Sequence, residues 1–291
     1  MGFSMIEPTQ IKTNAFKSIH PRKLLVRYGL KPDKSLGQNF LFDRSALQKI
    51  IRAAKLSGDE TVLEVGAGLG SLTRHLASAS GEVIAVEFDR RLIPALQFIT
   101  EDLHNVSIIE GDILKLNIGD LVKGKPYLVV ANIPYNLTSK LIRLLLETPS
   151  PAENIILTIQ KEVAERIVPR KRDLSLLSLS VSLYAISTIR GSIAAGSFYP
   201  KPSIDSRILE ITPYKEPIVD EDLIPTLFKM ARAAFNQKRK QIKNSLCTGL
   251  GVEAHVVEQW LLASGIEPSQ RPQTVQLEQW ASLAGQMRAS T

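Results

Sequence analysis

The sequence predicts an α/β protein with a doubly wound, mostly parallel sheet that has an antiparallel edge strand, followed by a small all-α domain. Short apolar, β-branched runs alternate with helical stretches from residue 60 to about 160, the pattern of β-α-β units whose sheet is covered on both faces. A proline-rich, acidic stretch follows at 213–225. Beyond it the chain shows only helical patterns.

The predicted strands are short and of the fully buried type. They cover 61–65, 83–87, 106–110, 127–131, 154–159 and 206–212. The last is expected to pair antiparallel with its predecessor and close the sheet edge. Predicted helices lie at 69–78, 91–101, 137–147, 160–168 and 174–189, and then at 227–236, 238–246, 252–263 and 277–287. We therefore expect a basic N-terminal segment at 1–34, an α/β domain at 35–213 and a small helical domain at 214–291.

Composition places the chain among folded, soluble proteins. It has 291 residues, which suits about two domains, with 44% apolar and 22% charged residues. Cys247 is the only cysteine, so no intrachain disulfide forms and a reducing cytosol is expected. The four histidines are far apart without ligand spacing, so no metal site is expected. Without a signal peptide or an apolar run long enough to span a bilayer, we expect a cytoplasmic protein that does not contact membranes.

The net charge of +7 is distributed unevenly. Residues 1–34 carry seven basic side chains against two acidic ones, 166–172 carry four basic side chains, and 229–243 carry six, the last two segments without an acid. Together these segments carry +15, so the rest of the chain carries −8. Such segregation is typical of a protein that contacts a polyanion along one face. Each run by itself is equally explained as a solvated surface.

A glycine-rich turn follows the first predicted strand, at Gly66, Gly68 and Gly70. The dinucleotide fingerprint has its third glycine one residue later, which disfavours an NAD dehydrogenase. Glu87 ends the next strand, where a carboxylate can accept both ribose hydroxyls, and Asp112 follows the third strand, where it can accept from an adenine amino group. Together they predict a site for an adenosine without pyrophosphate, and S-adenosylmethionine is the common ligand of that shape. The glycines alone would equally fit a tight strand-to-helix turn.

The fourth predicted strand leads into Asn132, Ile133, Pro134 and Tyr135, at the sheet edge where reacting residues of open α/β proteins lie. The exocyclic amine of a base is a poor nucleophile because its lone pair is delocalised into the ring. The Asn132 side-chain oxygen and the Pro134 carbonyl can both accept the amino hydrogens and localise that lone pair, while Tyr135 offers a face on which a flipped base stacks. The alternative is that Pro134 only ends the strand and Tyr135 packs in the core.

Three motifs are more specific than the glycine turn: GQNFL at 37–41, NIPYN at 132–136 and FNQKRK at 235–240. With them the chain resembles the rRNA adenine N6-dimethyltransferase family, and within it the bacterial small-subunit branch. The matching segments are 34–41, 64–70, 87–89, 111–112, 132–136, 160–163, 198–206 and 234–246. They occur in the family's order and cover most of the chain. At 171–173 this chain has Lys-Arg-Asp where members commonly have a glycine and a tyrosine.

The resemblance implies a Rossmann-like class I methyltransferase fold with S-adenosylmethionine as cofactor. It implies that Asn39 and Leu41 close over the cofactor. The implied lining residues are Gly66, Gly68, Glu87, Asp112 and Asn132. It also implies that Phe198 stacks on the target adenine opposite Tyr135, although Phe198 is equally explained as a core aromatic beside Pro200 and Pro202.

The implied substrate is a pair of adjacent adenosines in a hairpin loop near the 3′ end of small-subunit (16S) rRNA. Each would be methylated twice within a pre-30S particle, during ribosome biogenesis. We expect a monomeric enzyme and direct methyl transfer without a metal. The main alternative is a large-subunit rRNA methyltransferase of the macrolide-resistance type, which the basic FNQKRKQIKNSL stretch disfavours. A non-catalytic RNA-binding assembly factor is a second alternative, which the intact 132–135 motif disfavours.

Overall fold

The computed structural model describes residues 20–134, 137–168, 174–216, 218–237 and 239–290. Their contacts divide the chain into two compact units. The first runs up to Gln160 and adds Arg190–Glu210, and the second comprises Lys161–Ile189 and the chain from Ile211 onward. No described helix is long and apolar enough to cross a membrane.

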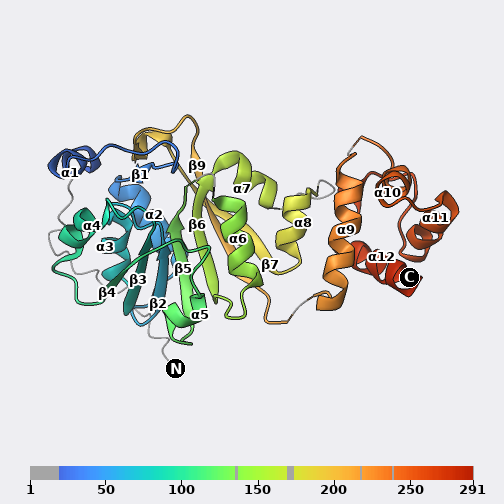
Figure 1. The fold of residues 1–291 in the computed structure, drawn as a ribbon, viewed down its shortest axis with the longest axis horizontal. Coiled ribbons are helices and arrows are strands. Elements are labelled where there is room, and N and C mark those ends of the chain that lie inside the picture. The colour runs from blue at the N-terminus through green and yellow to red at the C-terminus, as the bar shows by residue number, and fades with distance from the viewer. Residues whose placement is uncertain (1–19, 135–136, 169–173, 217, 238, 291) are drawn as a thin grey trace, which may run out of the picture. The chain divides into compact units, whose positions relative to one another are not determined.

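A seven-stranded sheet holds the strands in the order β4-β3-β2-β5-β6-β9-β7 and is mostly parallel with an antiparallel edge (Figure 1). Its strands are β2 (Thr61–Val65), β3 (Glu82–Glu87), β4 (Val106–Glu110), β5 (Tyr127–Asn132), β6 (Asn154–Gln160), β7 (Ala185–Ile193) and β9 (Ser206–Pro213). Leu63 of β2 faces Ile84 of β3 on one side and Val129 of β5 on the other. The chain therefore changes direction across the sheet at β2, and ligands of such sheets bind at the carboxyl ends of the strands flanking that point.

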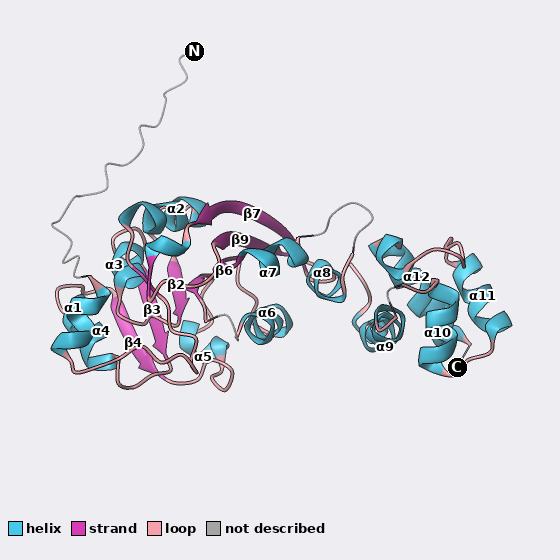
Figure 2. Ribbon diagram, turned by 90° about the horizontal axis from the view of Figure 1, so that it is seen from above, coloured by secondary structure: helices cyan, strands magenta, loops and turns pink. Residues whose placement is uncertain are grey.

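Helices of the first unit cover both faces of the sheet. They are α1 (Pro21–Arg27), α2 (Arg44–Ala54), α3 (Ser71–Ala77), α4 (Ile93–Thr100), α5 (Ile118–Val122) and α6 (Thr138–Glu147). Figure 2 shows α2 and α3 on one face and α5 and α6 on the other. Leu47 and Ile50 of α2 pack with Val62 and Val83 of the sheet in one apolar cluster. The predicted α/β class is confirmed, and most predicted elements differ from the observed ones by one to three residues at their ends.

Two predictions at the far edge of the sheet are wrong. The helix predicted over 174–189 is instead the short α8 (Leu176–Ser182) followed by β7, because Ile186, Thr188 and Ile189 are β-branched and favour a strand once β9 offers a pairing partner. β9 does lie beside β6 as predicted, but β7 lies beyond it, so β9 does not close the edge.

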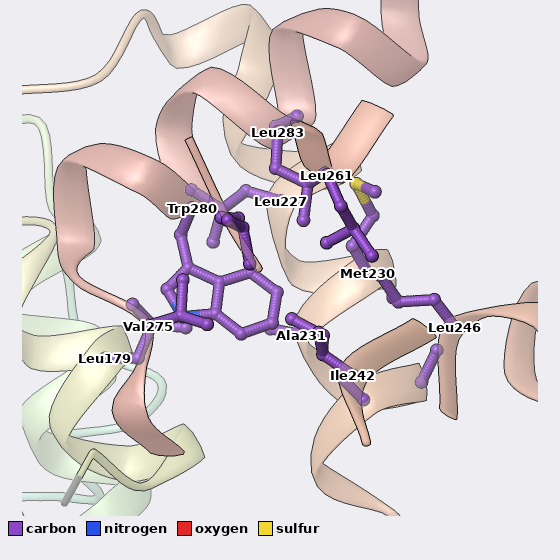
Figure 3. Close-up of a cluster of buried hydrophobic side chains, with 14 of the residues drawn as sticks. Leu179, Leu227, Met230, Ala231, Ile242, Leu246, Leu261, Val275, Trp280 and Leu283 are labelled. Atoms are coloured by element: carbon purple, nitrogen blue, oxygen red, sulfur yellow. The ribbon is translucent and has the colours of Figure 1, made fainter. Parts of the chain in front are cut away.

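The second unit is built around helices. They are α7 (Lys161–Ile167), α8, α9 (Ile224–Phe235), α10 (Ile242–Leu250), α11 (Ala254–Ala263) and α12 (Leu277–Ala289). The prediction of a helix from residue 238 is wrong at its start, because Arg239–Gln241 precede α10 as turn and extended backbone. Trp280 is fully buried and stacks on Phe235 with ring centroids 5.8 Å apart. Figure 3 shows Trp280 beside Leu227, Ala231 and Val275, so one apolar core joins α9 and α12.

Candidate active site

A cavity of about 270 Å³ opens at the carboxyl ends of β2, β3, β4 and β5. It collects nearly every site residue predicted from the sequence. Its lining includes Asn39, Leu41, Gly66, Gly68, Glu87, Asp112, Asn132, Pro134 and Phe198. Tyr135 lies outside the described residues. The cavity lies at the sheet's topological switch point, as ligand sites of open α/β sheets do.

The glycine turn after β2 requires glycine for its backbone conformation. Gly66, Gly68 and Gly70 have φ angles of +75°, +58° and +80°, a region that other residues rarely adopt. A Cβ on Gly70 would lie 2.9 Å from Cδ1 of Leu96 on α4, so this glycine also permits close packing of the two helices. The Gly66 amide donates to the Val86 carbonyl at 2.8 Å, which fixes the turn against β3.

Glu87 is held in place by two backbone amides. Its Oε2 accepts from the Gly68 amide and its Oε1 accepts from the Asp89 amide, both at 2.7 Å. Burial raises the pKa of Glu87, while the two donated hydrogen bonds oppose that rise. The carboxyl group is thereby oriented in the cavity wall, and each oxygen keeps a second lone pair with which it can accept a ligand hydroxyl.

Glu64, the last residue but one of β2, lines the cavity and was not assigned a role from the sequence. Its side chain is 1% exposed, and its Oε2 has no hydrogen-bond partner among the described residues. Burial raises the pKa of Glu64 to about 8; the nearby Thr73 hydroxyl opposes that rise and the Glu87 carboxylate adds to it. The available signal was a single acid within the otherwise uncharged strand TVLEV, because a charged residue is rarely buried without a purpose.

The amide of Asn132 is oriented by Asn39, which directly precedes the short strand β1 (Phe40–Leu41). The Nδ2 of Asn132 donates to the Asn39 carbonyl at 3.2 Å. Because the nitrogen makes this contact, the side-chain oxygen Oδ1 is the atom that can accept a hydrogen bond from a ligand. The Pro134 carbonyl accepts from the Leu137 amide at 3.0 Å, which leaves one of its two lone pairs for another donor.

Asp112 follows β4 and lies in the cavity wall with its side chain 29% exposed. Its Oδ1 accepts from the Leu114 amide at 3.1 Å, and its Oδ2 lies 4.0 Å from the Lys115 ammonium group. Both contacts are made within the loop after β4. They hold the carboxylate at the cavity edge.

A small second sheet forms another wall of the cavity. β1 (Phe40–Leu41) pairs antiparallel with β8 (Phe198–Tyr199), with Leu41 opposite Phe198. Phe198 is only 3% exposed and packs in the same apolar cluster as Leu41, yet it also lines the cavity. Phe198 therefore belongs to the apolar core and also forms part of the cavity wall, so the two interpretations offered for it do not exclude each other. Sequence reasoning did not predict this pairing, because two-residue strands leave no pattern.

Phe88 is a further residue without a predicted role. It follows Glu87, lines the cavity and is 58% exposed. Among the described residues, it is the one aromatic side chain in the group of exposed large apolar residues. An exposed ring at a cavity mouth offers a face on which a planar group can stack. No periodicity marks it in the sequence.

The charges of the lining restrict the ligand. Three carboxyl groups line the cavity, those of Glu64, Glu87 and Asp112, and none of the described lining residues is a lysine, arginine or histidine. These carboxyl groups would repel the negative charge of a pyrophosphate, because the lining has no cation to compensate it. They would not repel a neutral or positively charged ligand. The carboxylates, the glycine turn and the exposed Phe88 ring fit an adenosine that carries a positive charge.

Comparison with known proteins agrees with this geometry. A family model described as ribosomal RNA adenine dimethylase matches residues 29–288. The ribosomal RNA small subunit methyltransferase A of Dehalococcoides mccartyi (strain CBDB1) is 39% identical over 263 residues, covering 90% of each chain. That of Alkaliphilus metalliredigens (strain QYMF) is 34% identical over 283 residues, covering 94% of this chain and 99% of the relative.

Two solved structures share the fold over most of the chain. The 23S rRNA methyltransferase ErmE superposes with a TM-score of 0.69 at 27% identity, covering 86% of this chain and 100% of that one. A dimethyladenosine transferase from Plasmodium falciparum also gives 0.69, at 25% identity, covering 84% and 95%. The predicted methyltransferase fold is confirmed. The chain belongs to the ribosomal RNA adenine dimethylase family.

Proposed function

We propose that this protein is a small-subunit rRNA adenine N6-dimethyltransferase that uses S-adenosylmethionine as methyl donor. The observation that carries the proposal is the Asn132 amide, held through its nitrogen by Asn39, in the wall of a cavity rich in carboxyl groups. Family membership supports the reaction class. The names of the relatives at 34–39% identity support the small subunit as the source of the substrate.

The lining fits the proposed cofactor in each of its parts. Glu87 would accept from the ribose hydroxyls, Asp112 from the adenine amino group, and Phe88 would lie against the adenine ring. Glu64 would face the positively charged end of the ligand, which accounts for its unpartnered oxygen. When bound, S-adenosylmethionine supplies a methyl group on a positively charged sulfur.

The residues after β5 would prepare the nucleophile. The Oδ1 of Asn132 and the free lone pair of the Pro134 carbonyl would accept the two amino hydrogens of the target adenine, which draws the N6 lone pair out of the ring. Phe198 and Tyr135 would hold the flipped base between them. We propose direct, in-line transfer without a metal and without a covalent enzyme intermediate. Each transfer leaves S-adenosylhomocysteine and one proton from N6, which is released to solvent.

The proposed substrate is a pair of adjacent adenosines in a hairpin loop near the 3′ end of the rRNA, within a pre-30S particle in the cytoplasm. Exposed basic side chains on both units support contact with RNA phosphates. They include Arg22, Lys23 and Arg27 of α1, and Arg239 and Lys240 before α10. We propose that the enzyme acts as a monomer and that residues 214–291 form its particle-binding domain.

Labelled methyl transfer to isolated ribosomal subunits tests the proposal. Purified protein is incubated with methyl-labelled S-adenosylmethionine and with 30S or 50S particles from cells that lack the modification. We expect label in the 30S rRNA and none in the 50S rRNA. Label in 50S alone would favour the macrolide-resistance type, and 30S binding without label would favour a non-catalytic assembly factor.

A further inference from the structure

Two acidic side chains lie buried and adjacent at the end of β3. Glu87 and Asp89 are each 6% exposed, and the Asp89 amide donates to the Glu87 carboxyl group. Buried like charges this close destabilise each other unless cations or hydrogen bonds compensate them. Glu87 has backbone amides for this purpose, whereas Asp89 has the guanidinium group of Arg91.

Arg91 binds Asp89 with two parallel hydrogen bonds and extends to a second acid. Its Nε donates to Asp89 Oδ1 at 2.8 Å and its Nη2 to Asp89 Oδ2 at 2.7 Å. The same Nη2 lies 3.1 Å from Asp33 Oδ2. Paired bonds of this kind are the stronger and geometrically more specific form of ion pair. Arg91 itself does not line the cavity.

Asp33 lies shortly before the segment that forms one wall of the cavity, residues 36–41. Gln38 completes the connection from the other side, because its Oε1 accepts from the Asp33 amide and its Nε2 donates to Asp89 Oδ2, both at 2.8 Å. The next residue, Asn39, orients Asn132. Hydrogen bonds thus connect Arg91 to Gln38 in the cavity wall, and the peptide chain from Gln38 to Asn39 continues the connection to Asn132 at the end of β5.

We propose that Arg91 is a positioning residue that sets the affinity for the cofactor without touching it. By holding Asp33 against Asp89, it fixes residues 36–41 over the cavity and keeps Glu87 beside a charge-compensated neighbour. The identity of the ligand rests on the proposed function. The clamp formed by Asp33, Gln38, Asp89 and Arg91 rests on the contacts alone.

The test compares Arg91→Gln with a control variant, Arg90→Gln. The control removes the same charge from the neighbouring residue, whose side chain is exposed. Binding of S-adenosylhomocysteine is measured by calorimetry without RNA. We expect Arg91→Gln to weaken binding on the order of tenfold and Arg90→Gln to change it less than about twofold. Equal affinities of the two variants would overturn the proposal.

Three further measurements separate positioning from a general loss of structure. In Arg91→Gln the KM for S-adenosylmethionine should rise while kcat at saturating cofactor stays within about twofold of the wild type. Amide hydrogen exchange should accelerate at residues 34–41 and stay unchanged in β2 and β5. A uniform rise in exchange, or a fall in kcat with unchanged KM, contradicts the proposal.

Asp33→Asn keeps the test decisive if Arg91→Gln does not fold, since it opens the far end of the clamp and leaves Asp89 paired. It should weaken S-adenosylhomocysteine binding several-fold, and the effects of the two substitutions should not add, because both break one connection. Unchanged affinity in Asp33→Asn overturns the positioning role alone. Failure of the wild type to bind S-adenosylhomocysteine overturns the cofactor assignment, and the positioning role with it.

Discussion

The three carboxyl groups of the cavity differ in how their charge is compensated. Glu87 accepts two backbone amides and Asp112 is partly open to solvent, whereas Glu64 is fully enclosed with one oxygen unpartnered among the described residues. Burial therefore acts most strongly on Glu64 and raises its pKa to about 8. In the ligand-free protein this side chain is mostly protonated at neutral pH, and it is available to become charged when a cation binds.

Glu64 makes the stability of the ligand-free protein depend on pH. Its folded-state pKa lies above its unfolded value of 4.5, so between these values the folded state binds more protons and the stability falls as pH rises. Relative to Glu64→Gln, the wild type should lose up to about 1.4 kcal/mol per pH unit over this window. Urea unfolding at pH 5, 6.5 and 8 measures this difference. Glu110→Gln, at an exposed glutamate, is the control. If the free energy of unfolding of the wild type and that of Glu64→Gln change equally with pH, the prediction is contradicted.

Asn132→Ala should lower turnover by about 100-fold to 1,000-fold, because it removes an acceptor aligned with the nucleophile. Single-turnover methylation measures the chemical step. Binding of S-adenosylhomocysteine should weaken far less, since the lost contact to Asn39 is a single hydrogen bond. Near-normal turnover in this variant would remove Asn132 from the proposed reaction.

At the scale of elements, the glycine turn after β2 both lines the cavity and allows α3 to pack closely against α4. Gly70 has positive φ and would also bring a Cβ within 2.9 Å of Leu96, whereas Gly29 has positive φ and nothing within 4 Å. Gly29→Ala should cost about 1 kcal/mol for the backbone alone. Gly70→Ala should cost about 1–3 kcal/mol more, for the steric overlap. Urea unfolding compares the two, and equal losses would show that α3 and α4 do not pack closely there.

The elements also show what the sequence could predict. Strands such as β2 and β4 were predicted with their observed ends, because apolar β-branched runs between turn residues mark them directly. The prediction that each strand is fully buried holds for β2 but is wrong for β4, whose residues are partly buried or exposed because it is the edge strand of the sheet. β7 was missed because its pairing with β9 is non-local and because it closely follows the apolar, serine-rich stretch of α8, so the predicted helix was extended into it. The pairing of Leu41 with Phe198 and the clamp at Arg91 depend on contacts between distant segments, which no local pattern encodes.

At the scale of the whole molecule, the charge segregation gives the molecule its proposed RNA-facing surfaces. Arg22, Lys23 and Arg27 lie on the exposed side of α1, while Leu24 and Leu25 on its other side pack against Phe40 and Leu69 of the cavity walls. The second unit carries its own exposed bases before α10. Of the basic segment at 166–172, only Arg166 falls within the described residues.

Replacing Arg239 and Lys240 together with alanine should weaken binding to 30S particles without changing cofactor affinity. Each lost phosphate contact should flatten the slope of log affinity against log salt by about one. Filter binding across a salt series measures both effects. Lys49 and Arg52, two exposed bases of α2 outside the basic segments, provide a control double variant with the same charge change. An equal effect of the two variants would mean that net charge, rather than this surface, guides binding.

A map of the methyl groups that the enzyme adds would show its substrate and product directly. Undermethylated 30S particles are treated with the protein and S-adenosylmethionine, and the rRNA is digested and sequenced by mass spectrometry. We predict two adjacent N6,N6-dimethyladenosines in one hairpin loop near the 3′ end of the small-subunit rRNA, and far less of them with Asn132→Ala in the same reaction time. Newly added methyl groups only at other positions of the small-subunit rRNA, or no added methyl groups at all, would contradict the proposed function.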